Sequence, residues 1–322
     1  QHRIVARIEE LFSRLDAGVE ALQREKALLH RYRQSVLQAA VEGKLSEEWR
    51  KMHPNEGASV PHIVSSSLNE EESAIPNNWI WTSFSSLLIE PLRNGHSAKE
   101  SANGRGIRTL KLTAVTERQF SEKNSKITVA DPKRVKNLWL KKNDILIERA
   151  NTIDYVGLSA IYLGADDYAI FPDLLIRARV SPSYISPTFA DIVLRTPHSR
   201  DYFMKNAQGI SGNMPKIDQG TIEQLQIPLP PLNEQYYIID EFERRMSISD
   251  NLEAAIDNDI SRTKRLRQSV LKTAFEGKLV PQDPNDEPAS LLLERIRTER
   301  IKQTPTRGRK SNNNGRQMRL FQ

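Results

Sequence analysis

The stretch Arg33-Gln-Ser-Val-Leu-Gln-Ala-Ala-Val-Glu-Gly-Lys-Leu45 returns 234 residues later as Arg267-Gln-Ser-Val-Leu-Lys-Thr-Ala-Phe-Glu-Gly-Lys-Leu279. Aligned without a gap, residues 1–45 and 235–279 share 17 identical positions, and 11 of these fall in the last 15. An ungapped repeat of this kind indicates a duplicated structural element. Because the copies bracket a long unrelated segment, we expect them to hold that segment between them.

Both copies carry the apolar spacing of a long helix, over residues 4 to about 41 and about 235–275. Apolar side chains that recur alternately three and four positions apart are typical of helices that pack on one another. A helix of the first copy's length would be roughly 55 Å long and too thin to bury itself, so each helix needs a partner. The predicted seam consists of Ile4, Ile8, Leu11, Leu15, Leu22, Leu29, Val36, Phe242, Leu252, Ile256, Leu266 and Val270.

Both helices are predicted to end at Glu-Gly-Lys. Gly43 and Gly277 suit the left-handed backbone that follows many helix ends, and Lys44 and Lys278 lie near the negative pole of the helix dipole. Two unrelated amphipathic helices would explain the periodicity but not the shared Arg-Gln-Ser-Val-Leu. The matching ends therefore indicate matching roles.

The segment between the helices has two parts. Glutamates among Ser, Pro and Asn predict an acidic, mobile connector over 46–74. Short β-rich runs separated by turn residues then predict a mixed α/β domain over 75–231. Its expected strands are 109–113, 144–148, 157–163 and 174–180, and a helix entered through Pro187 is expected over 186–205.

The stiff stretch Ile227-Pro-Leu-Pro-Pro-Leu232 leads into the second helix, which is expected over 232–279. A turn-rich loop and a short helix are expected over 280–302, and a basic, disordered tail over 303–322. With the first helix at 1–45, the predicted fold class is α+β. A mixed α/β globular domain is flanked by two long helices that pair as an antiparallel coiled coil.

The composition narrows the class of protein. The chain has no cysteine, which excludes disulfides and thiolate zinc sites and fits a reducing compartment. No run approaches 18 apolar residues, so no membrane segment is predicted and we expect a cytoplasmic protein. Gln1-His-Arg-Ile is neither a signal peptide nor a usual start, and we expect the chain to be cut from something longer.

The net charge of +6 is unevenly distributed along the chain. Residues 301–322 carry six basic groups and no acidic group, so the remainder sums to zero. Within that remainder, residues 99–149 hold 13 basic and 6 acidic groups. A local basic excess on an otherwise neutral protein favours contact with phosphates.

Signatures of enzyme chemistry are missing from the sequence. There is no phosphate-binding P-loop, no Gly-rich dinucleotide turn, no His-Glu-x-x-His and no Asn-Pro-Pro-Tyr or Asp-Pro-Pro-Tyr. The six histidines show no pair at metal-ligand spacing. Asp144 and Glu148 are better explained by a salt bridge or a turn than by paired catalytic carboxylates. No catalytic residue and no metal ligand is therefore predicted.

Several motifs resemble the DNA-specificity subunit of type I restriction-modification enzymes over residues 1 to about 300. The most specific are Pro-Leu-Pro-Pro-Leu-Asn-Glu-Gln235 before a long helix, the twin helix ends, and Leu279-Val-Pro-Gln-Asp-Pro-Asn-Asp-Glu-Pro. Trp79, Leu140-Lys-Lys-Asn-Asp-Ile-Leu and Gly209-Ile-Ser-Gly also resemble that family's target-recognition domain.

The resemblance implies an architecture. In the family, two target-recognition domains alternate with two long helices that pack antiparallel and act as a ruler between the halves of a split DNA site. This chain holds the central helix, the second recognition domain and the C-terminal helix, without a first domain. Either an amino-terminal half is missing, or the chain is a half-subunit that works as a homodimer.

The resemblance also implies binding without chemistry. The recognition domain would contact double-stranded DNA, with loops in the major groove and Lys and Arg on phosphates. The helix pair would dock methyltransferase (modification) subunits and, through them, the restriction subunit that translocates DNA. No cofactor is expected on this chain, and S-adenosylmethionine, ATP and Mg are expected on partner subunits only. The predicted DNA contacts are Arg93, Asn94, Arg105, Arg108, Lys111, Arg149, Asn151, Ser211, Asn213 and Lys216.

Two alternatives belong to other classes. A coiled-coil scaffold whose middle domain binds protein would lack the steep salt dependence of phosphate binding. A single-chain nuclease or methyltransferase would modify DNA unaided. The base sequence recognised depends on loop geometry, which residue types do not encode.

Overall fold

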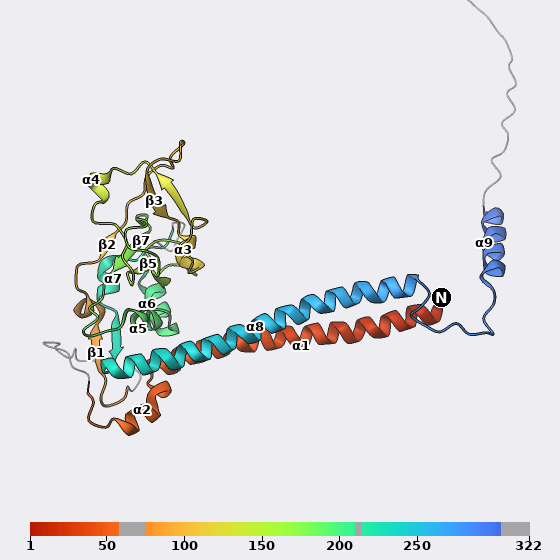
Figure 1. Cartoon of the computed structure of the whole chain (residues 1–322), viewed down its shortest axis with the longest axis horizontal. Helices are drawn as coiled ribbons and strands as arrows, with labels where there is room; N and C mark the ends of the chain where they lie inside the picture. Colours follow the sequence, from red (N-terminus) through yellow and green to blue (C-terminus); the bar gives the residue numbers. More distant parts are fainter. Residues whose placement is uncertain (58–74, 210–213, 304–322) are drawn as a thin grey trace, which may run out of the picture. The chain divides into compact units, whose positions relative to one another are not determined.

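The computed structural model describes residues 1–57, 75–209 and 214–303 (Figure 1). It divides into two compact units, a larger one of residues 19–261 and a smaller one that joins residues 1–18 to the chain from 262 onward. Ser211, Asn213, most of the predicted connector and all but the first residue of the predicted tail lie outside the described residues. Among the described helices, none is long and apolar enough to cross a membrane.

Two long helices, α1 (His2–Val41) and α8 (Leu232–Phe275), pack antiparallel (Figure 1). In the larger unit, Lys26 Nζ lies 2.8 Å from Asp257 and Arg33 Nη2 lies 2.6 Å from Asp250, so rising numbers in α1 face falling numbers in α8. In the smaller unit, Arg267 Nη2 lies 2.8 Å from Asp16 in the same sense. These pairs confirm the predicted antiparallel helix pair.

The seam between the helices differs from the prediction at two positions. Leu252 and Leu266 are exposed (51% and 45%), whereas their neighbours Glu253 and Arg267 are half-buried and make interhelical ion pairs. The physical reason is the period, because a straight helix repeats every 3.6 residues and drifts from a strict 3.5-residue spacing. The other predicted seam residues are half-buried or buried: Ile4, Ile8, Leu11, Leu15, Leu22, Leu29, Val36, Phe242, Ile256 and Val270.

The two helix ends have the same backbone conformation but different surroundings. Gly43 and Gly277 have φ of 73° and 69°, a left-handed conformation that favours glycine. A Cβ on Gly43 would lie 2.5 Å from Cγ of Pro76, whereas nothing lies within 4 Å of one on Gly277. The first end is packed against the start of the middle domain, and the second end is open within its unit.

The start of the predicted connector is folded. A short 3-10 helix η1 (Lys44–Ser46) leads into α2 (Glu47–Met52), whose Trp49 is buried and stacks on His53 with ring centroids 4.4 Å apart. The sequence predicted a connector here because of its acidic composition. The glutamates instead occupy the first turn of α2, where the helix dipole favours negative charge.

The described residues of the middle domain form three small antiparallel sheets. The first pairs β1 (Ile80–Ser83) with β8 (Gln226–Leu229), and the second pairs β3 (Ile107–Leu110) with β4 (Ser125–Thr128). The central sheet has the order β2-β7-β5-β6, with bounds Arg93–Asn94, Leu175–Ala178, Ile145–Glu148 and Ser159–Ile161. The strand expected over 109–113 lies instead at Ile107–Leu110, and Thr113 begins the short helix α3. The other three predicted strands are present and shorter than expected.

Short helices complete the domain: η2 (Phe84–Leu87), α3 (Thr113–Thr116), α4 (Pro132–Val135), α5 (Pro187–Leu194), α6 (Pro197–Asn206) and α7 (Gln219–Glu223), with α9 (Ala289–Gln303) after the long pair. The single helix expected over 186–205 is two helices, because Pro197 cannot continue α5 and instead starts α6, capped by Thr196.

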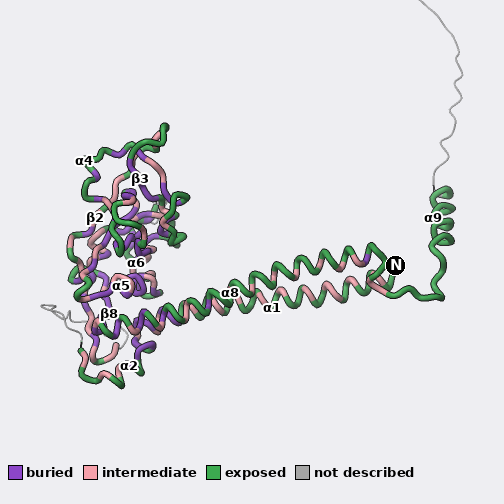
Figure 2. The backbone as a smooth tube through the Cα atoms, viewed as in Figure 1, coloured by how far each residue is buried: buried purple, intermediate pink, exposed green. Residues whose placement is uncertain are grey.

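The central sheet has an apolar core on each face. Ile145, Ile147 and Ile176 belong to one core, which also contains Val36 of α1 and Phe242 of α8. Leu146 and Leu175 belong to the other core, which is formed with residues 107–140 and 158–171. The strands β5, β6 and β7 are thus buried along their whole length. Figure 2 shows buried residues in purple within the middle domain.

The start of α8 is joined to the middle domain by a buried carboxylate. Glu234 is fully buried and accepts hydrogen bonds from Ser46 Oγ (2.8 Å), Arg50 Nη1 (2.7 Å) and Asn78 Nδ2 (2.9 Å). The next residue, Gln235, accepts from Ser186 N–H (2.8 Å) and donates to two backbone carbonyls. The Asn-Glu-Gln motif therefore fixes the helix, the folded start of the connector and the domain to one another.

Replacing Glu234 by Ala is expected to lower the free energy of unfolding by about 3–5 kcal/mol, because Arg50 and two other donors lose their shared acceptor. Urea unfolding of the whole chain measures this change. Glu243→Ala, an exposed position on the same helix, is the matched control and should change stability by less than about 0.5 kcal/mol. Equal effects of the two substitutions would contradict the structural role of Glu234.

Candidate nucleic-acid interface

Four of the predicted DNA contacts gather at one end of the central sheet. Arg149 follows β5, and its backbone pairs with Leu174 before β7 and with Ile217 (N–O distances 2.8 and 2.9 Å). Ala150 bridges Lys216, and Gln219 Nε2 donates to Asn94 Oδ1 at the end of β2 (3.2 Å). The structure therefore brings together Asn94, Arg149, Asn151 and Lys216, which we call the sheet-end group.

The polar atoms of the sheet-end group differ in their availability. Asn151 Nδ2 donates to Glu148 (2.6 Å) and Arg149 Nη1 donates to the carbonyl of Asp173 (3.3 Å). Asn94 and Lys216 are exposed, and the Lys216 ammonium has no hydrogen bond or ion pair within the described part of the chain. Lys216 and the amide of Asn94 are thus the groups of this cluster most open to a ligand.

Glu148 lies beneath this group and is fully buried. Burial raises the pKa of its carboxyl, against the hydrogen bonds that it accepts from Asn151 and from Thr116 Oγ1 (2.9 Å). Asp144, at the other end of β5, instead forms an ion pair with Arg179 at 2.6 Å. The two carboxylates therefore have separate structural partners, in line with the salt-bridge interpretation.

A second group, Arg105, Arg108 and Lys111, lies on and around the β3–β4 hairpin. Arg108 is held by Ser125 (3.0 Å) and Glu122 (3.1 Å), and its guanidinium lies 4.8 Å from the ring centre of Tyr168. Lys111 Nζ donates to the carbonyl of Lys123 (3.0 Å). Arg105 is exposed in the loop before β3. These residues occupy a different arm of the domain from the sheet-end group.

Arg93 lies apart from both groups. It is the register partner of Arg177 on β7, and it lines a pocket of about 570 Å³ on the same face of the sheet. Its neighbour Asn94 points to the opposite face, because successive residues of a strand alternate. Arg93 and Asn94 therefore present their side chains on different sides of one edge strand.

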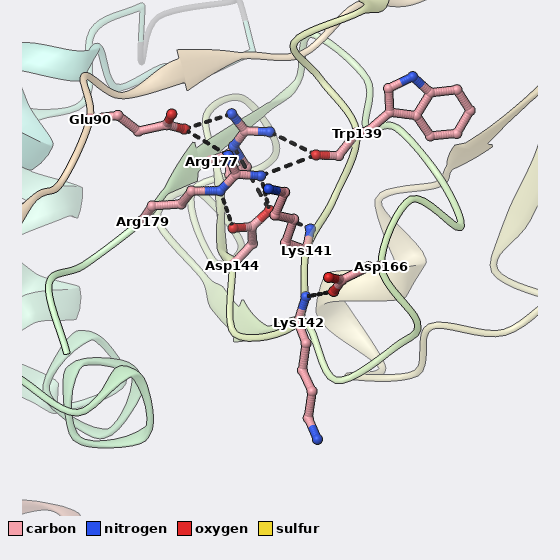
Figure 3. Close-up of polar contacts among 8 residues, drawn as sticks. All are labelled: Glu90, Trp139, Lys141, Lys142, Asp144, Asp166, Arg177 and Arg179. Carbon is pink, nitrogen blue, oxygen red and sulfur yellow. Dashed lines mark hydrogen bonds and ion pairs between the residues drawn. The ribbon is translucent and has the colours of Figure 1, made fainter.

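Figure 3 shows the charged network that forms one wall of this pocket. Arg177 is 2% exposed and donates to Glu90 (2.8 Å) and to the carbonyl of Trp139 (3.0 Å). Arg179 donates to both oxygens of Asp144 (2.6 and 3.0 Å) and also to Trp139 (3.2 Å). Burial lowers the pKa of Arg177, whereas the hydrogen bond to Asp144 raises the pKa of Arg179.

Sequence reasoning missed Arg177 and Arg179. They lie two apart in Leu174-Leu-Ile-Arg-Ala-Arg-Val180, so both point to one face of a strand. The alternation of the two arginines could have indicated that they share a site. The apolar residues around them led instead to the prediction of a strand alone. Among the described residues, no group of three or more His, Asp or Glu side chains is placed to hold a metal ion.

Sequence relatives cover nearly the whole chain. It is 28% identical over 310 residues to the type I restriction enzyme EcoKI specificity subunit of Escherichia coli K12, which covers 93% of this chain and 62% of that subunit. The StySPI specificity subunit of Salmonella potsdam is also 28% identical, over 309 residues, with the same coverage. A 48-residue segment is 58% identical to the EcoEI specificity subunit of Escherichia coli. No established family profile matches the chain.

Solved structures share the fold. The HsdS subunit from Thermoanaerobacter tengcongensis matches 87% of this chain and 58% of its own with a TM-score of 0.51 and 18% identity. A chain described in work on complex assembly and conformational transition of the type I R-M system matches 83% of this chain, also with a TM-score of 0.51. The present chain spans about three fifths of these proteins (58–62%). The sequence relatives and the shared fold agree, and the chain is therefore similar over most of its length to the specificity subunits of type I restriction enzymes.

Proposed function

We propose that this chain is a non-catalytic DNA-specificity subunit, or half-subunit, that contacts one half of a split site in double-stranded DNA. The observation that carries the proposal is the sheet-end group, where the end of β2, the segment after β5 and the segment before α7 bring amide and cationic side chains to one end of the central sheet. Sites on rigid elements hold donors in the fixed geometry that base readout needs.

Different members of this group suit different parts of DNA. Gln219 orients Asn94 by donating to its Oδ1, which leaves the Asn94 amide hydrogens for acceptors on base edges in the major groove. Lys216 suits a backbone phosphate, which attracts any unpaired cation regardless of sequence. Arg149, Asn151, Arg93 and the hairpin residues Arg105, Arg108 and Lys111 are proposed as further contacts, together with Ser211 and Asn213, which lie outside the described residues.

The helix pair is proposed to dock methyltransferase subunits and, through the assembled complex, the restriction subunit. In the larger unit, Leu28, Tyr32, Ile248 and Leu252 are exposed although they are large and apolar. The interhelical ion pairs place Tyr32 level with residue 251, so these side chains are close along the pair. An apolar flank outside the seam supports packing of further helices. S-adenosylmethionine, ATP and Mg are proposed to reside on those partner subunits.

The internal repeat supports a homodimer. Leu37 and Val41 of the first copy are buried in the core that α1 shares with the middle domain. Their equivalents 234 positions later are Leu271 and Phe275, which are 38% and 91% exposed. We propose that the middle domain of a second copy of this chain covers the second helix end, as the first end is covered by its own domain.

Replacing Lys216 by Ala is expected to weaken binding to all duplexes alike and to reduce the slope of log affinity against log salt by about one, because one phosphate contact is lost. Asn94→Ala should instead change the sequence preference, by about 1–3 kcal/mol at one base pair. Fluorescence anisotropy in a salt series measures the first effect, and sequencing of methylated adenines made by the reconstituted complex measures the second. If the affinity of the wild-type chain for DNA does not change with salt concentration, the result favours the coiled-coil scaffold alternative.

Replacing Leu271 and Phe275 by Asp is expected to convert a dimer of this chain into monomers, because two charges would be placed in the covered helix end. Light scattering coupled to size-exclusion chromatography gives the molar mass. Ile301→Asp, an exposed apolar position on α9, is the control and should leave the dimer intact. A wild-type chain that is monomeric at high concentration contradicts the homodimer.

A further inference from the structure

The pocket beside Arg93 has a wall of fixed charges. Arg177 and Arg179 are matched there by Glu90 and Asp144, so this wall carries two positive and two negative charges. Within the described part of the chain, the Nε of Arg177 is buried without a hydrogen-bond partner, and a carboxylate oxygen of Asp144 lies 3.9 Å from it. Buried donors are seldom left unpaired in folded proteins. The wall is therefore rigid and retains one unsatisfied donor.

The rest of the lining has an excess of positive charge. Arg93, Lys136 and Lys141 line the pocket, and their side chains make no hydrogen bond or ion pair with any other described residue. Among the described residues that line the pocket, Asp167 is the one carboxylate outside the fixed wall. The three cations come from β2, from the end of α4 and from the loop before β5, so separate parts of the fold converge on one concave space.

We propose that this pocket binds a phosphate group, supplied by the DNA backbone. Three cations on separate elements suit a phosphate, whose several oxygens accept from different directions at once. The proposal rests on the proposed function and deepens it by adding Lys136 and Lys141 to the DNA-contacting surface. Arg93 and Asn94 are consecutive on an edge strand, so a duplex lying along this edge reaches the pocket and the sheet-end group together.

The test uses two lysine pairs that remove the same charge from the full chain. Lys136→Ala with Lys141→Ala removes two of the three cationic side chains that line the pocket outside the fixed wall. Lys133→Ala with Lys142→Ala is the matched control. Lys133 lies on α4, the helix whose C-cap is Lys136. The side chain of Lys142 points away from the charged network in Figure 3. All four lysines are exposed, so both variants are expected to fold, and their thermal unfolding checks this.

Affinity for a random-sequence duplex is measured over a range of salt concentrations. The pocket variant is expected to bind about tenfold more weakly at low salt, with a slope smaller by one to two, whereas the control keeps the wild-type slope. Titration calorimetry with inorganic phosphate forms the second arm. Heat that appears with wild type and control but not with the pocket variant, while DNA slopes are equal, assigns the pocket to free phosphate.

Equal slopes together with no phosphate heat in any variant overturn the proposal. A wild-type chain that binds no DNA would remove the proposed function instead, and the phosphate titration would still decide whether the pocket binds the anion. If the alanine variant unfolds at a lower temperature, Lys136→Gln with Lys141→Gln retains the side-chain length and removes only the charge.

Discussion

The larger unit depends on one buried carboxylate. Glu234 stands in the first turn of α8 and accepts hydrogen bonds from Ser46, Arg50 and Asn78. Ser46 and Arg50 lie in the folded start of the connector, and Asn78 lies at the start of the middle domain. A buried charge is tolerated only when its hydrogen bonds are complete, so each of these segments requires the others. The end of α1, the start of the middle domain and the start of α8 are thereby fixed together, and Gln235 extends the same junction to Ser186.

The central sheet packs between two apolar cores and holds the proposed functional side chains in place. Alternate residues of β7 serve different cores, since Ile176 and Ala178 face the core shared with the long helices while Leu175 faces the other. The other edge strand, β6, is buried like β5 and β7, so the exposed parts of the described sheet are its ends and its edge strand β2. The sheet-end group and the basic pocket occupy those two places, and Arg93 and Asn94 join them through adjacent positions of one strand.

The helix pair combines a seam of moderate burial with ionic contacts. Arg33 reaches Asp250 and Glu253 from a seam position, and Lys26 reaches Glu253 and Asp257. The hydrogen bond with Arg33 is the main cause that lowers the pKa of Glu253. Charged residues that pair across a helix–helix seam set the choice and the orientation of the partner helix. The antiparallel register is thus set by these pairs as much as by the leucines.

The sequence alone determined the two helices, their glycine ends and the resemblance to specificity subunits, because periodicity, turn residues and the repeat are local patterns. It could not place Leu252 and Leu266 outside the seam, since a shift of one residue depends on how the helix period accumulates against a partner. Nor could it find Arg177 and Arg179, whose significance comes from Glu90 and Asp144, distant in sequence. Tertiary structure decided these points because burial and ion pairing join residues that no local pattern connects.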